Sequence, residues 1–369
     1  MGFEYFIDIT WSTAAQVIML GFIGGILSGF IGSGGAFFMT PGMMNLGVLG
    51  PVAVASNITH KFGKAMVGSK RHSELGNVDK KLSVFMLITA AIGIRMAVMV
   101  MKLMFDGSGE HSTVKGAGAD LYISLVFVIV LTIVSLSMLR DINKSRKNID
   151  KGPSRKIVDF LNKFKLHPII YFPVADVYVS LWVVLISGLA CGYLAGTIGV
   201  GGFIGVPAMI YVFGTSASVA AGSELYLAMF MGAFGALNYA FEGLVDIRLT
   251  LLLFAGSLFG IYVGAYGTKV VKEIAIRLVT ALIILLCVLS RFIAIPMYLQ
   301  QLGYVDFDPA YNDYFNTASK AMLYFSGISG ALLILFFVLK AYFQRRKIQA
   351  SFSAEYPLTV KEQLLEKNQ

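Results

Sequence analysis

A series of long apolar runs constrains this chain more than any other feature of its sequence. An α-helix needs about 20 apolar residues to cross the hydrocarbon core of a bilayer. Nine stretches approach that length: residues 13–32, 48–68, 82–104, 120–139, 179–199, 217–240, 249–267, 276–299 and 319–343. Only 14% of the 369 residues are charged, against about 25% in soluble domains. The sequence therefore predicts an all-α polytopic membrane protein with seven to nine membrane segments.

The formal net charge of +9 is concentrated in a few places. Residues 140–165 hold nine Lys and Arg but three Asp, and residues 340–347 add four more basic residues. Because basic loops stay in the cytoplasm, we expect these segments and the basic loop 69–81 to be cytoplasmic. The acidic or neutral loops 105–120 and 300–316 are then outside. The charge orients the chain in the lipid bilayer, and we predict no nucleic-acid partner.

An internal repeat becomes visible when the sequence is shifted by 167 residues. The segment from Gly21 to Gly35 then aligns without gaps with the segment from Gly188 to Gly202, and Asp79 aligns with Asp246. The loop around Asp79 is basic and the loop around Asp246 is acidic, so the two loops are predicted on opposite sides of the membrane. This favours inverted repeats, provided that each glycine-rich segment forms a hairpin without a net crossing. A parallel duplication with four full spans in each half is the alternative.

The repeat and the charges together predict the organisation of the chain. Residues 1–139 form a first transmembrane repeat, and residues 140–178 form a basic cytoplasmic loop. Residues 179–343 form a second repeat with an extra span, and residues 344–369 form a cytoplasmic C-terminal tail. Within the basic loop, apolar residues recur at helical spacing over 157–164, which fits an interfacial amphipathic helix and fits a solvated connector equally well.

Glycines occur in two patterns. Every fourth residue from position 21 to 29, and from position 188 to 196, is Gly, which allows two helices to pack backbone to backbone. The clusters Gly32-Ser33-Gly34-Gly35 and Gly199-Val200-Gly201-Gly202 instead predict helix breaks. A break at membrane depth is tolerated where it is buried or lines a cavity, and a helix that starts there offers free N–H groups to an anion. Matching breaks in two halves of a chain point to a transporter substrate site.

These features resemble the sulfite exporter TauE/SafE family, of the 4-toluene sulfonate uptake permease type. Each Gly-rich helix ends in GxGG and is followed by a segment with a proline, Pro41 or Pro207, and then by an Ala/Ser-rich helix around residues 52–56 or 219–223. The resemblance implies transport of a sulfur-containing anion, such as sulfite, thiosulfate, sulfate, sulfoacetate or another organosulfonate, across a bacterial inner membrane.

A polar stripe lies beyond the first break. On a helix, Asn57, His60, Lys61 and Lys64 share one face, while Glu224 occupies the position in the second half that matches Asn57. Lys64 could instead reach toward water, and Glu224 could merely neutralise a buried base. The predicted substrate-binding residues are Gly32, Ser33, Gly34, Gly35, Ser56, Asn57, Lys61, Gly199, Gly201, Gly202 and Ser223, with Ser56 and Ser223 as hydroxyl donors. We assign proton or ion coupling to His60 and Glu224.

Two further arginines, Arg95 and Arg291, lie within apolar spans, where they either line a pathway or pair with a carboxylate. Cys191 and Cys287 lie in apolar runs and are predicted to be core residues. The sequence has no P-loop, metal-ligand cluster or catalytic triad spacing, so we predict no cofactor, no metal and no enzyme activity. The leading hypothesis is a secondary anion transporter that works by alternating access. An anion channel is the alternative, and a membrane-embedded enzyme using His60, His72 and Glu74 is a weaker one.

Overall fold

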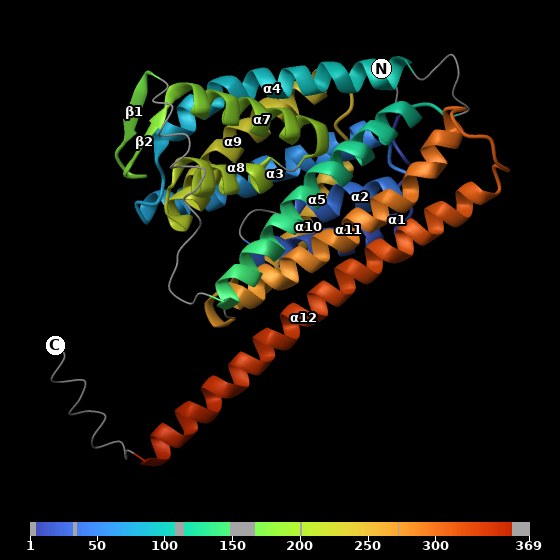
Figure 1. Cartoon of the computed structure of the whole chain (residues 1–369). Helices are drawn as coiled ribbons and strands as arrows, with labels where there is room; N and C mark the ends of the chain where they lie inside the picture. The colour runs from blue at the N-terminus through green and yellow to red at the C-terminus, as the bar shows by residue number, and fades with distance from the viewer. Residues whose placement is uncertain are drawn as a thin grey trace.

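Helices make up most of this chain (Figure 1). The structure, a computed structural model, describes residues 5–31, 35–107, 114–147, 167–199, 201–271 and 273–355. The elements in chain order are α1 (Trp11–Ile31), α2 (Ala36–Asn45), α3 (Gly50–Glu74), α4 (Lys80–Asp106), α5 (Ala117–Lys147), β1 (Ile169–Phe172), β2 (Val177–Ser180), α7 (Leu181–Ile198), α8 (Gly202–Pro207), η2 (Ala208–Phe213), α9 (Ala217–Phe241), α10 (Ile247–Val270), α11 (Glu273–Gln301) and α12 (Tyr311–Glu355). Gly32, Ser33, Gly34 and the segment 157–164 lie outside the described residues.

Eight helices of the described chain are long and apolar enough to cross a membrane. They correspond to eight of the nine predicted segments, so the prediction of a polytopic, mainly α-helical membrane protein is confirmed, while the β1–β2 hairpin was not predicted. The ninth predicted segment, 48–68, lies in α3, which is not among these eight helices. Helix α3 carries Lys61, Lys64, Lys70 and Arg71. Its first nine residues are all buried, so this helix is surrounded by protein along that part. A polar helix can lie at membrane depth when other helices cover it.

The two glycine stripes pack helices closely together, as predicted. α1 lies along α10, and a Cβ atom added to Gly25 would lie 2.6 Å from the carbonyl oxygen of Ser257. In the same way α7 lies along α4, and a Cβ atom added to Gly192 would lie 2.0 Å from the carbonyl oxygen of Ala90. Only glycine permits this approach of two backbones.

The short helices α2 and α8 pack against the helices that precede them. In α2, Gly42 lies against the side chain of Leu20, and Met39 lies against Gly24 in α1. In the second half, Gly205 of α8 lies near Cys191 of α7. The ten residues of α2 rise about 15 Å, so α2 is too short to cross a core of about 30 Å.

Helix α4 runs between the two ends of the molecule. At its start, the Asp79 carboxylate accepts a hydrogen bond from Leu82 N at 2.9 Å and from the amides of Val174 and Ala175, each at 3.0 Å. These last two amides belong to the turn between β1 and β2, an antiparallel pair. Near the other end of α4, Lys102 Nζ lies 2.5 Å from Glu242 Oε2. The residues between positions 80 and 102 rise about 33 Å, which is close to the thickness of the hydrocarbon core.

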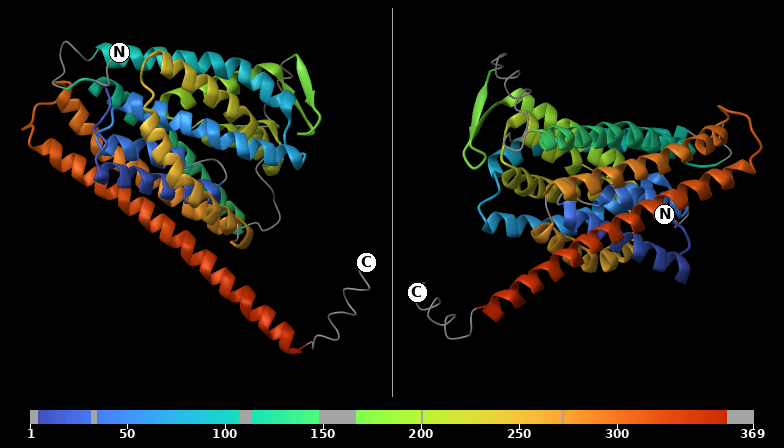
Figure 2. Two further views of the ribbon diagram at one scale, coloured as in Figure 1. Left: turned by 180° about the vertical axis from the view of Figure 1, so that it is seen from behind. Right: turned by 60° about the horizontal axis from the view of Figure 1, so that its bottom comes forward.

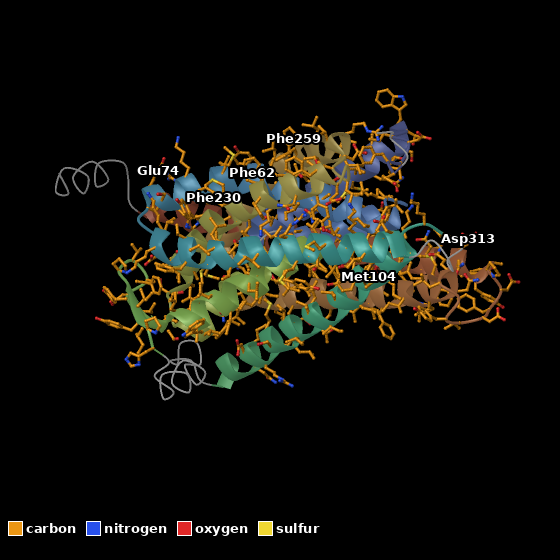
Figure 3. The ribbon with its side chains drawn as sticks, turned by 90° about the horizontal axis from the view of Figure 1, so that it is seen from above. Phe62, Glu74, Met104, Phe230, Phe259 and Asp313 are labelled. Atoms are coloured by element: carbon orange, nitrogen blue, oxygen red, sulfur yellow. The ribbon has the colours of Figure 1, made fainter. Side chains whose placement is uncertain are left out.

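Two further views show which loops lie at each end of the molecule. The β1–β2 hairpin and the C-terminal end of α12 lie toward one end, and the loop between α11 and α12 lies at the other (Figure 2). Seen from above, Glu74 at the end of α3 and Asp313 at the start of α12 are far apart along the long direction of the molecule (Figure 3). Loops that the sequence assigns to opposite sides of a membrane therefore lie at opposite ends of the fold.

Candidate substrate site

The N-terminal end of α2 and the C-terminal end of α7 meet at Asn57 of α3. Asn57 Nδ2 donates hydrogen bonds to Ala36 O at 3.1 Å and to Thr40 Oγ1 at 2.7 Å, both in α2. Thr40 Oγ1 donates to Ile198 O, at the end of α7, at 3.3 Å. Gly199 follows with a φ of 74°, a left-handed conformation that favours glycine, and it lies against the Asn57 side chain. The structure thus brings Gly35, Asn57 and Gly199 into one buried region.

An ion pair joins α3 to α9 one helical turn farther on. Lys61 Nζ lies 3.2 Å from Glu224 Oε1, and the two side chains are only 13% and 2% exposed. Glu224 also lies against Gly205 in α8, where an added Cβ atom would be 3.1 Å from Glu224 Cγ. The pair therefore sits beside the helix that follows the second break, and two residues predicted for different roles are brought together.

His60 and Lys64 complete the polar face of α3. His60 Nε2 lies 2.7 Å from Ser257 Oγ of α10, and its ring packs on Phe254. Lys64 Nζ contacts the hydroxyl of Ser28 in α1. In the part of the chain that the structure describes, no carboxylate lies within 4.0 Å of Lys64. Among the described residues, this face therefore has two lysines but only one ion pair, that of Lys61 with Glu224.

Ser56 and Ser223 are buried but lie in two separate junctions. Ser56 Oγ donates to Asp246 O at 3.4 Å, and Ser223 Oγ accepts from Asp79 N at 2.8 Å. Asp79 and Asp246 precede α4 and α10, so Ser56 ties α3 to the start of α10 and Ser223 ties α9 to the start of α4. The structure does not bring these two hydroxyl groups to Lys61.

The sequence did not indicate several residues of this region. Thr40 and Ser257 became visible only through contacts between segments far apart in the chain. Lys64, by contrast, belonged to the predicted polar stripe. Arg95 pairs with Glu242 at 3.8 Å, which is one of the two predicted alternatives for this arginine.

Arg291 is a fully buried residue of α11. Its guanidinium contacts the side-chain oxygen of Asn45 and lies 3.0 Å from Ser319 Oγ. These contacts join the end of α2 to α11 and α12.

Cys191 and Cys287 are buried free thiols, as predicted.

The fold defines the chain as a multi-pass membrane protein with a partly buried cluster of polar and basic side chains between its helices. The sequence model of the sulfite exporter TauE/SafE family matches residues 17–291, which is most of the chain. The chain belongs to this family.

Curated relatives agree with this assignment. The chain is 25% identical over 275 residues to probable membrane transporter protein YjnA of Bacillus subtilis (strain 168), covering 74% of this chain and 97% of the relative. It is 24% identical over 284 residues to probable membrane transporter protein YunE of the same organism, covering 73% and 94%. No solved structure matches the chain. The comparisons support transport as the general function.

Proposed function

We propose that this protein is a secondary transporter that moves a small anion across the cell membrane by alternating access. The anion is a sulfur oxyanion or an organosulfonate, such as sulfite, thiosulfate, sulfate or sulfoacetate. The observation that carries the proposal is the surplus of basic side chains on α3, where Lys61 pairs with Glu224 and Lys64, one turn away, contacts the hydroxyl of Ser28 and no carboxylate among the described residues. Buried charges are costly unless they are compensated, so a bound anion would complete this region.

The backbone next to the lysines favours an anion as well. Helix α2 starts beside Asn57, and because its N-cap residue is Gly35, no N-cap side chain caps its first N–H groups. The first N–H groups of a helix lack partners within it and carry partial positive charge. Lys61, Lys64 and the N-terminal end of α2 would each attract an oxyanion. The break residues Gly32, Ser33 and Gly34 and the predicted role of His60 in coupling remain part of this proposal.

Alternating access follows from the proposed inverted repeats, residues 1–139 and 179–343. Two pairs of contacts support the duplication, because each recurs after a shift of 167 residues. The bond of Ser56 to Asp246 corresponds to that of Ser223 with Asp79, and the backbone approaches at Gly25 and Gly192 correspond in the same way. The separation of about 33 Å along α4 supports the inversion.

We place the protein in the inner membrane, with the 140–178 loop and the 344–369 tail in the cytoplasm.

Thiol labelling tests the inversion at two matched positions. Lys80 and Ile247 are both exposed, follow Asp79 and Asp246, and lie 167 residues apart. We expect Lys80→Cys to react with an impermeant maleimide only from the cytoplasmic side and Ile247→Cys only from the outside. The unmodified protein is the control, because Cys191 and Cys287 are buried. Labelling of both variants from the same side would contradict the inverted arrangement.

The substrate is tested by counterflow in proteoliposomes that contain the purified protein. Vesicles are loaded with sulfite, thiosulfate, sulfate, sulfoacetate or taurine, with carboxylates of similar size as controls, and exchange with the same labelled anion is followed. We expect saturable exchange of at least one sulfur-containing anion and a weaker response to the carboxylates. The absence of exchange for every sulfur-containing anion would contradict the substrate class.

A further inference from the structure

The side-chain amide of Asn57 has no N–H group left for a ligand. An amide nitrogen has two hydrogens, and those of Nδ2 are directed to Ala36 O and Thr40 Oγ1 at 3.1 and 2.7 Å. The side chain is completely buried, and its other polar atom, Oδ1, has no hydrogen-bond partner among the described residues. A buried acceptor without a donor is unfavourable. Asn57 is therefore suited to a ligand that needs oxygen lone pairs, and an oxyanion is not such a ligand.

Two further oxygen atoms follow this amide in a chain of hydrogen bonds. Thr40 Oγ1 is 2.7 Å from Asn57 Nδ2 and 3.3 Å from Ile198 O. A hydroxyl and a carbonyl oxygen each have two lone pairs, so both keep accepting capacity beside these bonds. Ile198 is the last residue of α7, where the helix carries partial negative charge. Carbonyl, amide and hydroxyl oxygens are the ligands that hard cations prefer.

We propose that Asn57 Oδ1, Thr40 Oγ1 and Ile198 O bind a sodium ion that is transported together with the anion. These three oxygens include no carboxylate, so they favour a monovalent over a divalent cation. Broken helices in transporters use their C-terminal ends and free carbonyls for sodium in this way. The proposal rests on the proposed function, because it names the coupling ion of that same site.

The charges around the three oxygens fit a coupled pair of ions. Lys61 follows Asn57 by one helical turn, Lys64 by two, and both repel a cation, while Glu224 attracts it. An anion bound at the lysines would offset that repulsion. Each ion therefore strengthens the binding of the other, and this mutual effect must be equal in both directions.

Thermal unfolding of the purified full-length protein tests the cation site. Melting is followed in sodium chloride, potassium chloride and choline chloride at equal ionic strength. We expect a saturable rise in Tm with sodium only. Thr40→Val, which removes the hydroxyl, should lose the sodium-dependent rise, and Thr40→Ser, which keeps it, should retain that rise. Equal Tm values in all three salts would overturn the proposal, since a water molecule at the same oxygens gives no cation selectivity.

Sulfite titrations separate this inference from the proposed function. With sulfite as the choline salt, sodium should raise its apparent affinity by about 5- to 150-fold, the usual range of coupling between two sites. Sulfite binding that does not depend on sodium would overturn the sodium site and leave anion transport standing. A sodium response in a protein that neither binds nor exchanges any sulfur-containing anion would support the cation site and contradict the proposed function. If Thr40→Val does not fold, the comparison of salts in the unmodified protein decides the question.

Discussion

Replacing Lys61 with Met, or Glu224 with Gln, is expected to abolish anion exchange by the reconstituted protein. Each change leaves one charge of a buried pair without its partner. Removal of one member of a buried ion pair costs about 3–5 kcal/mol, so both variants should also melt at a lower temperature. Exchange is measured in proteoliposomes at equal protein content, so that lower yield does not appear as lower transport.

The double variant Lys61→Met/Glu224→Gln separates stability from transport. It removes both charges, so we expect it to recover much of the lost stability without recovering exchange. Lys102→Met is the matched control, because Lys102 pairs with Glu242 near the end of α4 and its side chain is 54% exposed. Exposed pairs contribute little to stability, and this variant should transport normally. Normal transport by the double variant would show that the buried pair has only a structural role.

Gly192→Ala is expected to destabilise the fold strongly. The added Cβ atom would lie 2.0 Å from Ala90 O and 2.5 Å from Ala90 Cα. Both are backbone atoms of α4, so relief requires α4 and α7 to separate. Overpacking in a tight core costs about 1–3 kcal/mol, and more where it cannot relax. The measurements are the yield of monodisperse protein after detergent extraction and its Tm.

Gly107→Ala is the control for this change. Gly107 follows α4 and has no atom within 4 Å of an added Cβ atom. We expect its yield and Tm to match those of the unmodified protein. A Gly192→Ala protein with the same Tm would contradict the close packing of α4 on α7.

The sequence was sufficient to predict most of the membrane helices, because lipid demands long apolar runs and tolerates few charges. The glycine stripes also predicted tight helix packing. Helix α3 was counted among the apolar runs, although it is more polar than the eight candidate spans. Other helices bury the N-terminal part of α3, and the local sequence does not show which helices these are.

The candidate site was less predictable, because its contacts join distant segments. The pairing of Lys61 with Glu224 spans 163 residues and was one of two readings of these charges. The contact between Thr40 and Ile198 spans 158 residues, and nothing in either local sequence indicates it. The direction of the Ser56 hydroxyl, toward Asp246 O, depends on how α3 packs against α10. Such details are set by tertiary packing.

The central claim, that this protein carries a sulfur-containing anion by alternating access, is tested most directly by counterflow of labelled sulfite in proteoliposomes. A carrier binds its substrate in each cycle, so the account predicts saturable uptake that is accelerated by unlabelled sulfite inside the vesicles. That acceleration should be lost in Lys61→Met and kept in Lys102→Met. Uptake that neither saturates nor depends on internal sulfite, together with large unitary currents in planar bilayers, would contradict the account and identify an anion channel.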